Sequence, residues 1–164
     1  MIATPLVKDC LLDSAREVFE TMVFMALEEA GDEVPDIDED LSLLGTITFK
    51  GAVEGVLGIS CDLDCARTIA ANMLGTDPDG DLSPDDINDA VGEVANMVMG
   101  SVKARVQDEI GTMDVSIPSV VKGRQLQSGL GEGTHNLGVT VYIEEEHVMK
   151  LSLLYRGGGD VNDN

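Results

Sequence analysis

The chain has 164 residues, of which 43% are hydrophobic and only 3% aromatic, with no tryptophan. This length predicts one domain around an aliphatic, methionine-containing core. There are 31 acidic residues against 10 basic ones, and the formal net charge of -21 repels nucleic acid phosphates and anionic membranes. We therefore expect neither nucleic acid nor a membrane as a partner.

Apolar residues recur at every third or fourth position over residues 5–30, which predicts one long helix. Two β-prone runs, 45–50 and 55–61, follow an acidic linker and predict a β-hairpin. Residues 63–75 predict a second helix that stops at Gly75. The expected buried positions are Leu11, Ala15, Val18, Met22, Met25 and Ala26 in the first helix, and Leu63, Ala66, Ile69, Ala70, Met73 and Leu74 in the second.

Ser83 is a suitable N-cap and Pro84 a suitable first residue for a third helix over residues 84–109. Three β-rich segments follow, and the last two predict a hairpin through an acidic turn. This order of elements predicts an α/β (α+β) fold, with helices packed on a largely antiparallel β-sheet. The β-rich segments are 112–120, 134–146 and 147–156; the linkers are 31–40, 77–86 and the glycine-rich 122–133; the domain is 1–156 and the loose tail 157–164.

Several segments resemble metal or nucleotide sites but lack the decisive residues. Residues 77–88 alternate oxygen ligands, yet the glycine is misplaced for a calcium loop and Asn88 stands where a bidentate glutamate belongs. The glycines of 129–133 are not followed by the lysine of a phosphate loop. Cys61 and Cys65 fit no zinc spacing, so we expect buried or strand-end thiols there and no metal site.

The remaining cysteine makes an odd set of three, which is typical of reduced thiols in the cytoplasm. The apolar start of the chain is interrupted by Lys8 and Asp9, and no apolar run is long enough to span a membrane. We therefore expect a cytoplasmic location, with neither an export signal nor membrane insertion.

The predicted helix 84–109 has two distinct faces. Its outward face displays Glu93 and Asn96 side by side, one turn apart. Gly100 lies on the same face at a cost to the helix of about 1 kcal/mol relative to alanine. This glycine has two alternative explanations: the close approach of another protein, or a neutral change that the helix tolerates. The buried face comprises Ile87, Val91, Val94, Val98, Ser101 and Val102, and the outward face Asp89, Glu93, Asn96, Gly100, Lys103 and Gln107.

The first helix repeats this pattern. An alignment that places Asp13 on Asp89 also places Glu17 on Glu93 and superposes the apolar stripes of the two helices. Such an agreement is compatible with an internal duplication. In this alignment Glu20 occupies the position of Asn96.

At these residues the chain resembles the CheC/CheX/FliY phosphatases of bacterial chemotaxis, and most closely CheX. The shared pattern is an acidic residue, a glutamate, an asparagine and a later proline, here Asp89, Glu93, Asn96 and Pro118. The segments REVFETM, LGTITFKGAVEGVLGIS and ARTIAANMLG also look like CheX, and the resemblance spans residues 6–156.

The resemblance implies that the chain removes the aspartyl phosphate of a CheY-type receiver. Asn96 would orient the attacking water, Glu93 would pair with the receiver's lysine, and the receiver would supply Mg²⁺, so the chain would need no cofactor of its own. From their place on the outward face, we also expect Asp89, Gly100 and Lys103 to belong to the contact surface. The first-helix site is expected to be inactive, because the carboxylate of Glu20 cannot donate a hydrogen bond to water. A homodimer is implied as well.

Two other functions are considered beside the phosphatase. The chain could be a binding module, either a scaffold similar to flagellar switch components or a domain that grips receivers without hydrolysing them. It could also be an enzyme that depends on a metal or nucleotide, but no qualifying motif supports that class. The intact pair of Glu93 and Asn96 favours the phosphatase.

Overall fold

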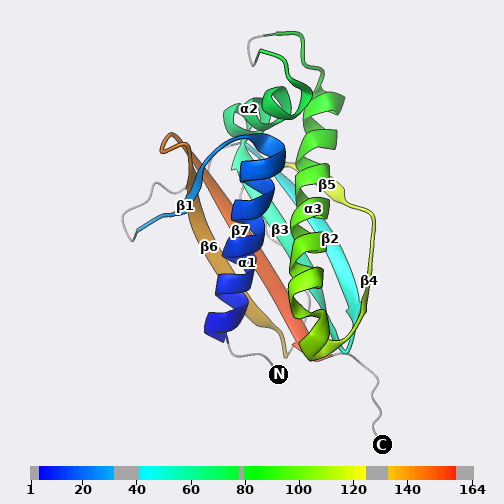
Figure 1. The fold of residues 1–164 in the computed structure, drawn as a ribbon. Helices are drawn as coiled ribbons and strands as arrows, with labels where there is room; N and C mark the ends of the chain where they lie inside the picture. The colour runs from blue at the N-terminus through cyan, green and yellow to red at the C-terminus, as the bar shows by residue number, and fades with distance from the viewer. Residues whose placement is uncertain (1–3, 32–40, 78–79, 125–132, 158–164) are drawn as a thin grey trace, which may run out of the picture.

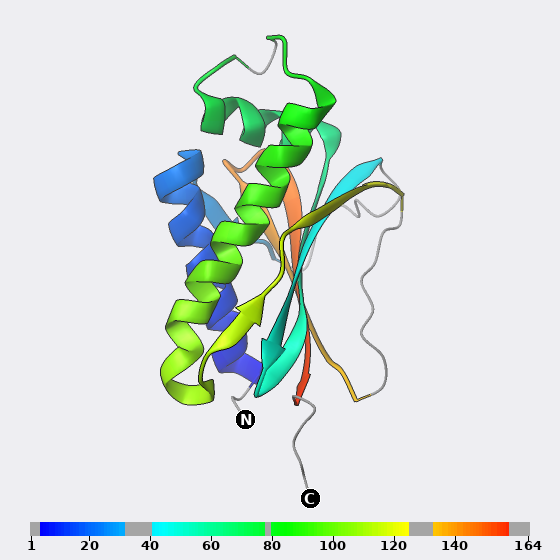
Figure 2. The ribbon, with the colours of Figure 1, turned by 90° about the vertical axis from the view of Figure 1, so that its right-hand side faces the viewer.

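The computed structural model of the chain describes residues 4–31, 41–77, 80–124 and 133–157. Three helices cover one face of a sheet (Figure 1), and a quarter turn shows the helices as one layer and the strands as the other (Figure 2). The predicted α+β fold is therefore confirmed. The predicted linkers 31–40, 77–86 and 122–133 and the tail 157–164 lie partly or almost wholly outside the described residues.

Within the described residues, seven strands form one sheet in which all pairings are antiparallel. The strand order is β1-β6-β7-β3-β2-β4, and β5 also pairs with β2. Both predicted hairpins are confirmed, as β2 with β3 and β6 with β7. The strands are β1 Leu27–Glu29, β2 Ser42–Gly51, β3 Val53–Asp62, β4 Met113–Val115, β5 Ser119–Gly123, β6 His135–Ile143 and β7 His147–Gly157.

The first helix is shorter than predicted. α1 (Thr4–Val18) continues into one wider turn, η1 (Phe19–Val23), and the prediction of a single helix over 5–30 is wrong beyond that turn. Phe24 ends the helix, because its φ of 62° is left-handed and its N–H bonds to the carbonyl of Phe19.

The chain then turns into the edge strand β1. Met25 and Leu27 are buried whereas Ala26 and Glu28 are exposed, and this period of two belongs to a strand. Leu27 pairs with Ile143 of β6. The methionine and alanine spacing that extended the predicted helix therefore reflects a strand packed on the same core. The predicted buried positions Met22, Ala26 and Leu74 are exposed.

α2 (Leu63–Leu74) and α3 (Pro84–Ile110) match their predicted ranges to within one residue. α2 ends at Gly75, which adopts a φ of 70°. α3 begins with a capping box: the Ser83 hydroxyl accepts from the backbone N–H of Asp86 over 3.0 Å, and the Asp86 carboxylate accepts from the Ser83 N–H over 3.2 Å. These reciprocal bonds satisfy backbone donors at the helix start.

α3 runs beside α1 and packs on β2, in the helical layer of Figure 1. Gly45 of β2 permits this close approach, since a Cβ added there would lie 3.0 Å from a methyl group of Val91. Val91, Val94 and Val98 are at most 1% exposed. The core thus fixes which side of α3 faces outward.

The segment 112–120 forms parts of two strands rather than one. β4 and β5 both pair with β2, and the regular strand pairing is interrupted between them. Pro118 lies in this gap, where its missing N–H costs no ladder bond.

Candidate functional site

The outward face of α3 carries the residues that the sequence analysis selects. Asp89, Glu93, Asn96 and Gly100 are exposed, and Lys103 is half-buried. The predicted outward face of this helix is therefore confirmed for the four exposed positions. Ser101, predicted to be buried, is half-buried at the interface with α1.

Glu93 and Asn96 lie side by side on this face. The Asn96 side-chain amide donates to Oε1 of Glu93 over 3.4 Å, which is a long and therefore weak hydrogen bond. Within the described residues no other hydrogen bond or ion pair engages either side chain. Both groups are consequently available to a partner that approaches α3 from solvent.

The connection between β4 and β5 brings Pro118 to the same region. A Cβ added to Gly92 would lie 3.5 Å from the ring of Pro118 and 3.4 Å from a methyl group of Val120. Because Gly92 precedes Glu93 and is one turn from Asn96, the structure brings Pro118 next to the other residues of the sequence pattern.

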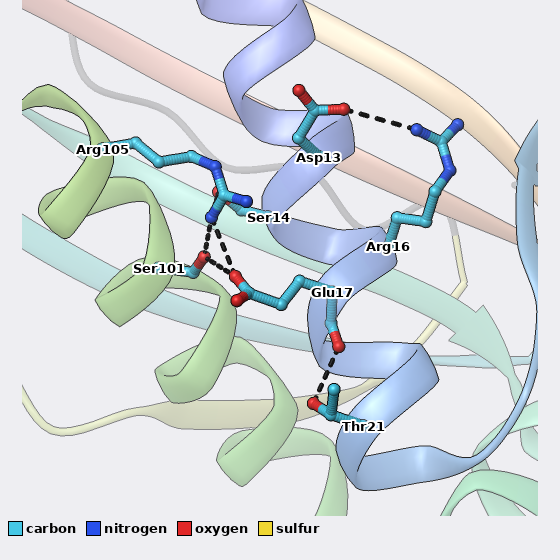
Figure 3. Close-up of polar contacts among 7 residues, drawn as sticks. All are labelled: Asp13, Ser14, Arg16, Glu17, Thr21, Ser101 and Arg105. Atoms are coloured by element: carbon cyan, nitrogen blue, oxygen red, sulfur yellow. Dashed lines mark hydrogen bonds and ion pairs between the residues drawn. The ribbon is translucent and has the colours of Figure 1, made fainter.

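The corresponding residues of α1 are bonded within the chain (Figure 3). Glu17 accepts from Nη1 of Arg105 over 2.9 Å and from the Ser101 hydroxyl over 2.8 Å, and both partners lie on α3. Arg105 also donates to Ser101, and its contact with Ser14 is 3.4 Å. The glutamate aligned with Glu93 therefore links two helices.

The electrostatics of Glu17 follow from these bonds. The Arg105 guanidinium, and next the Ser101 hydroxyl, hold the pKa of the Glu17 carboxyl below its usual 4.5. Hydrogen bonds and a positive charge favour the ionised carboxylate. Glu20, which takes the place of the asparagine, is exposed.

A cavity of about 270 Å³ lies away from the Glu93 and Asn96 pair. It opens between the start of α1 and the end of α3, and its lining includes Cys10, Phe49 and Arg105. Cys61 and Cys65 are buried, as predicted. The described part of the chain contains no group of three or more His, Cys, Asp and Glu side chains arranged to hold a metal ion. No described helix is long and apolar enough to cross a membrane.

Comparison with known proteins identifies the family. The model of the family described as chemotaxis phosphatase CheX matches residues 43–141, which include Glu93, Asn96 and Pro118. The chain belongs to the CheX family. A curated relative from Thermotoga maritima, described as CheY-P phosphatase CheX, is 28% identical over 126 residues, covering 77% of this chain and 79% of the relative.

Solved structures share the fold. The chemotaxis protein CheX from Vibrio vulnificus has a TM-score of 0.70 and 24% identity, over 92% of this chain and 99% of that one. A chemotaxis protein from Desulfovibrio vulgaris Hildenborough has a TM-score of 0.76 and 19% identity, over 95% and 100%. The CheX-CheY-BeF3-Mg²⁺ complex from Borrelia burgdorferi has a TM-score of 0.68 and 18% identity, over 92% and 97%.

Two features of this surface are absent from the sequence analysis. One is the network of Glu17, Ser101 and Arg105. The sequence signal for it was that Ser101 and Arg105 lie one helical turn apart, so that both can reach the same partner. The other is Ile117, which is 87% exposed beside α3. Neither feature follows from periodicity, because each depends on which elements lie next to one another.

Proposed function

We propose that the chain hydrolyses the aspartyl phosphate of a CheY-type receiver domain. The observation that carries the proposal is the exposed pair of Glu93 and Asn96, 3.4 Å apart on α3, in a member of the CheX family. The description of the Thermotoga relative as a CheY-P phosphatase supports the reaction, and the Borrelia complex with CheY supports the partner.

In this proposal Asn96 holds the attacking water. A side-chain amide both donates and accepts hydrogen bonds, so it can orient a water in line with the phosphorus. The water attacks the phosphorus, the bond to the aspartyl oxygen breaks, and inorganic phosphate leaves. Within the described part of the chain Asn96 makes a single, long bond to Glu93, so the amide can turn toward that water.

Glu93 docks the receiver in this proposal. Its carboxylate pairs with the receiver's lysine and so places α3 over the phosphoryl group. Asp89, Gly100 and Lys103 extend the contact along the outward face. The receiver brings the Mg²⁺, which neutralises the phosphoryl oxygens, and the chain contributes no metal ligand. The Borrelia complex, which contains Mg²⁺ together with CheY, supports this division of labour.

The decisive measurement is the decay of a phosphorylated receiver from the same organism, with and without the protein. We expect the wild-type chain to accelerate the decay, and Glu93→Ala and Asn96→Ala to abolish most of the acceleration. Gln107→Ala provides a matched control, because Gln107 is exposed on the same face of α3 two turns beyond Gly100. Binding without accelerated decay would instead identify a receiver-binding module.

We also propose that the chain forms a homodimer, as its resemblance to CheX implies. Sedimentation equilibrium over a range of concentrations tests this directly. A mass that stays at one chain, about 17.4 kDa, up to the highest concentration would contradict the dimer.

A further inference from the structure

Ile117 is the most exposed of the large hydrophobic side chains among the described residues. It is 87% exposed, whereas the next, Phe24, is 69% exposed. A single exposed apolar residue needs no explanation in general. The surroundings of Ile117 distinguish it, because the backbone on both sides is held and the adjacent helix carries the candidate site.

Ser116, on one side, is tied to β2. Its N–H donates to the Thr48 carbonyl over 2.9 Å, and its hydroxyl accepts from the Thr48 N–H over 3.0 Å. The same hydroxyl donates to the Ile117 carbonyl over 2.9 Å. The segment is flanked by two short strands, β4 and β5, which both pair with β2.

Pro118, on the other side, restricts Ile117 further. A residue before proline is confined to extended backbone conformations. The ring of Pro118 also packs at Gly92, where an added Cβ would be only 3.5 Å away. The backbone of Ile117 is therefore restrained on both sides, and Figure 2 shows its segment alongside α3.

We infer that Ile117 is an apolar anchor for the receiver domain. This inference rests on the proposed function and adds the residue that carries docking affinity on the Asn96 side of α3. The occupant is an apolar patch on the receiver beside its phospho-aspartate. We place the patch there because Ile117 directly precedes Pro118, whose ring packs at Gly92 on the helix that carries Glu93 and Asn96. A rigid anchor loses little entropy on binding.

The test compares Ile117→Ser with Ile117→Val and with Leu74→Ser. Leu74 is a matched control, since it is 55% exposed at the end of α2. The receiver is treated with beryllofluoride and Mg²⁺, so that BeF3 stands in for the phosphoryl group, and its affinity is measured by titration. Decay of the phosphorylated receiver is then followed at several receiver concentrations. Thermal unfolding verifies that each variant is folded.

We expect Ile117→Ser to weaken binding about tenfold and to raise KM by a similar factor, because a buried isoleucine contributes about that much to an equilibrium constant. The maximal rate should not change, since Ile117 touches no reacting atom. Ile117→Val should largely restore affinity, and Leu74→Ser should behave as wild type.

Unchanged affinity in folded Ile117→Ser would overturn the inference, as would a lower maximal rate at unchanged affinity. If the wild-type chain binds the receiver without accelerating its decay, the phosphatase proposal fails while the affinities still decide the role of Ile117. If the wild-type chain binds no receiver, both proposals fall.

Discussion

Arg105 on α3 bonds to Glu17 on α1 across the interface between the two helices, with 2.9 Å between Nη1 and Oε1. The alignment of the two helices places Glu17 on Glu93, yet the two carboxylates have different surroundings. Among the residues that the structure describes, Glu93 has a single long bond, to its neighbour Asn96, whereas Glu17 also accepts from Ser101. One copy of the pattern therefore links helices, and the other is free to meet a partner.

The bonded state of Glu17 predicts a pH-dependent contribution to stability. Its pKa is lowered in the folded chain, so the contribution is present above the ordinary value of 4.5 and is lost as the pH falls through the folded value. Glu17→Gln should therefore lower the Tm slightly at pH 7 and not at all in strong acid. The effect is small because the pair is exposed.

Thermal unfolding of both proteins across this pH range measures the difference. Glu20→Gln is the control, because it removes the same charge from an exposed position on the adjoining turn. A Tm difference for Glu17→Gln that persists at pH 2 would mean that the ion pair is not its source.

Asn96→Asp should abolish the proposed phosphatase activity while leaving the fold intact. The substitution keeps the shape of the side chain but replaces a donor with a carboxylate, which cannot donate to water and repels phosphoryl oxygens. Loss of at least about 100-fold is expected for a residue that positions a reacting group. Gln107→Glu adds the same charge on the same face and should retain activity. Comparable activity in Asn96→Asp would remove the amide from the mechanism.

Much of the fold follows from local sequence signals. Helix α3 was predictable from two local signals. Ser83, Pro84 and Asp86 mark its start, and a stripe of valines marks the face that packs on the core. The exposure of Glu93 and Asn96 follows from the same period. These features depend on residues that are neighbours in the sequence.

The sequence predictions fail where contacts between elements distant in the sequence determine the local structure. Met25 fits a helical stripe and an alternating strand equally well, and only the pairing of Leu27 with Ile143 selects the strand. The link from Glu17 to Arg105 similarly requires α1 and α3 to lie antiparallel and adjacent. Periodicity within one segment carries no information about its neighbour in space.

The turn between β6 and β7 predicts a stabilising substitution. Glu144 and Glu145 have φ values of 55° and 59°, a left-handed conformation that costs a non-glycine residue of the order of 1 kcal/mol. Glu145→Gly should therefore stabilise the chain by up to about 1 kcal/mol in chemical denaturation.

Glu144→Gly serves as the contrasting variant. The Glu144 carboxylate accepts from the backbone N–H of Ala26 over 2.5 Å, so its removal also loses a contact to the segment before β1. Glu144→Gly should gain less than Glu145→Gly. A loss of stability in Glu145→Gly would show that the left-handed turn is not strained.

Substitutions at Gly100 distinguish its effect on helix stability from its effect on receiver docking. Apart from its chain neighbours and the backbone of its own helix, no described atom lies within 4 Å of a Cβ added at this position, so the folded chain has room for a side chain. Gly100→Ala should stabilise the helix by about 1 kcal/mol. Gly100→Leu should also fold, but its larger side chain would rise beside Asn96 and weaken receiver docking. Unfolding curves and titration with the beryllofluoride-treated receiver measure the two effects independently. Wild-type affinity in folded Gly100→Leu would exclude Gly100 from the docking surface and leave a tolerated neutral change as its explanation.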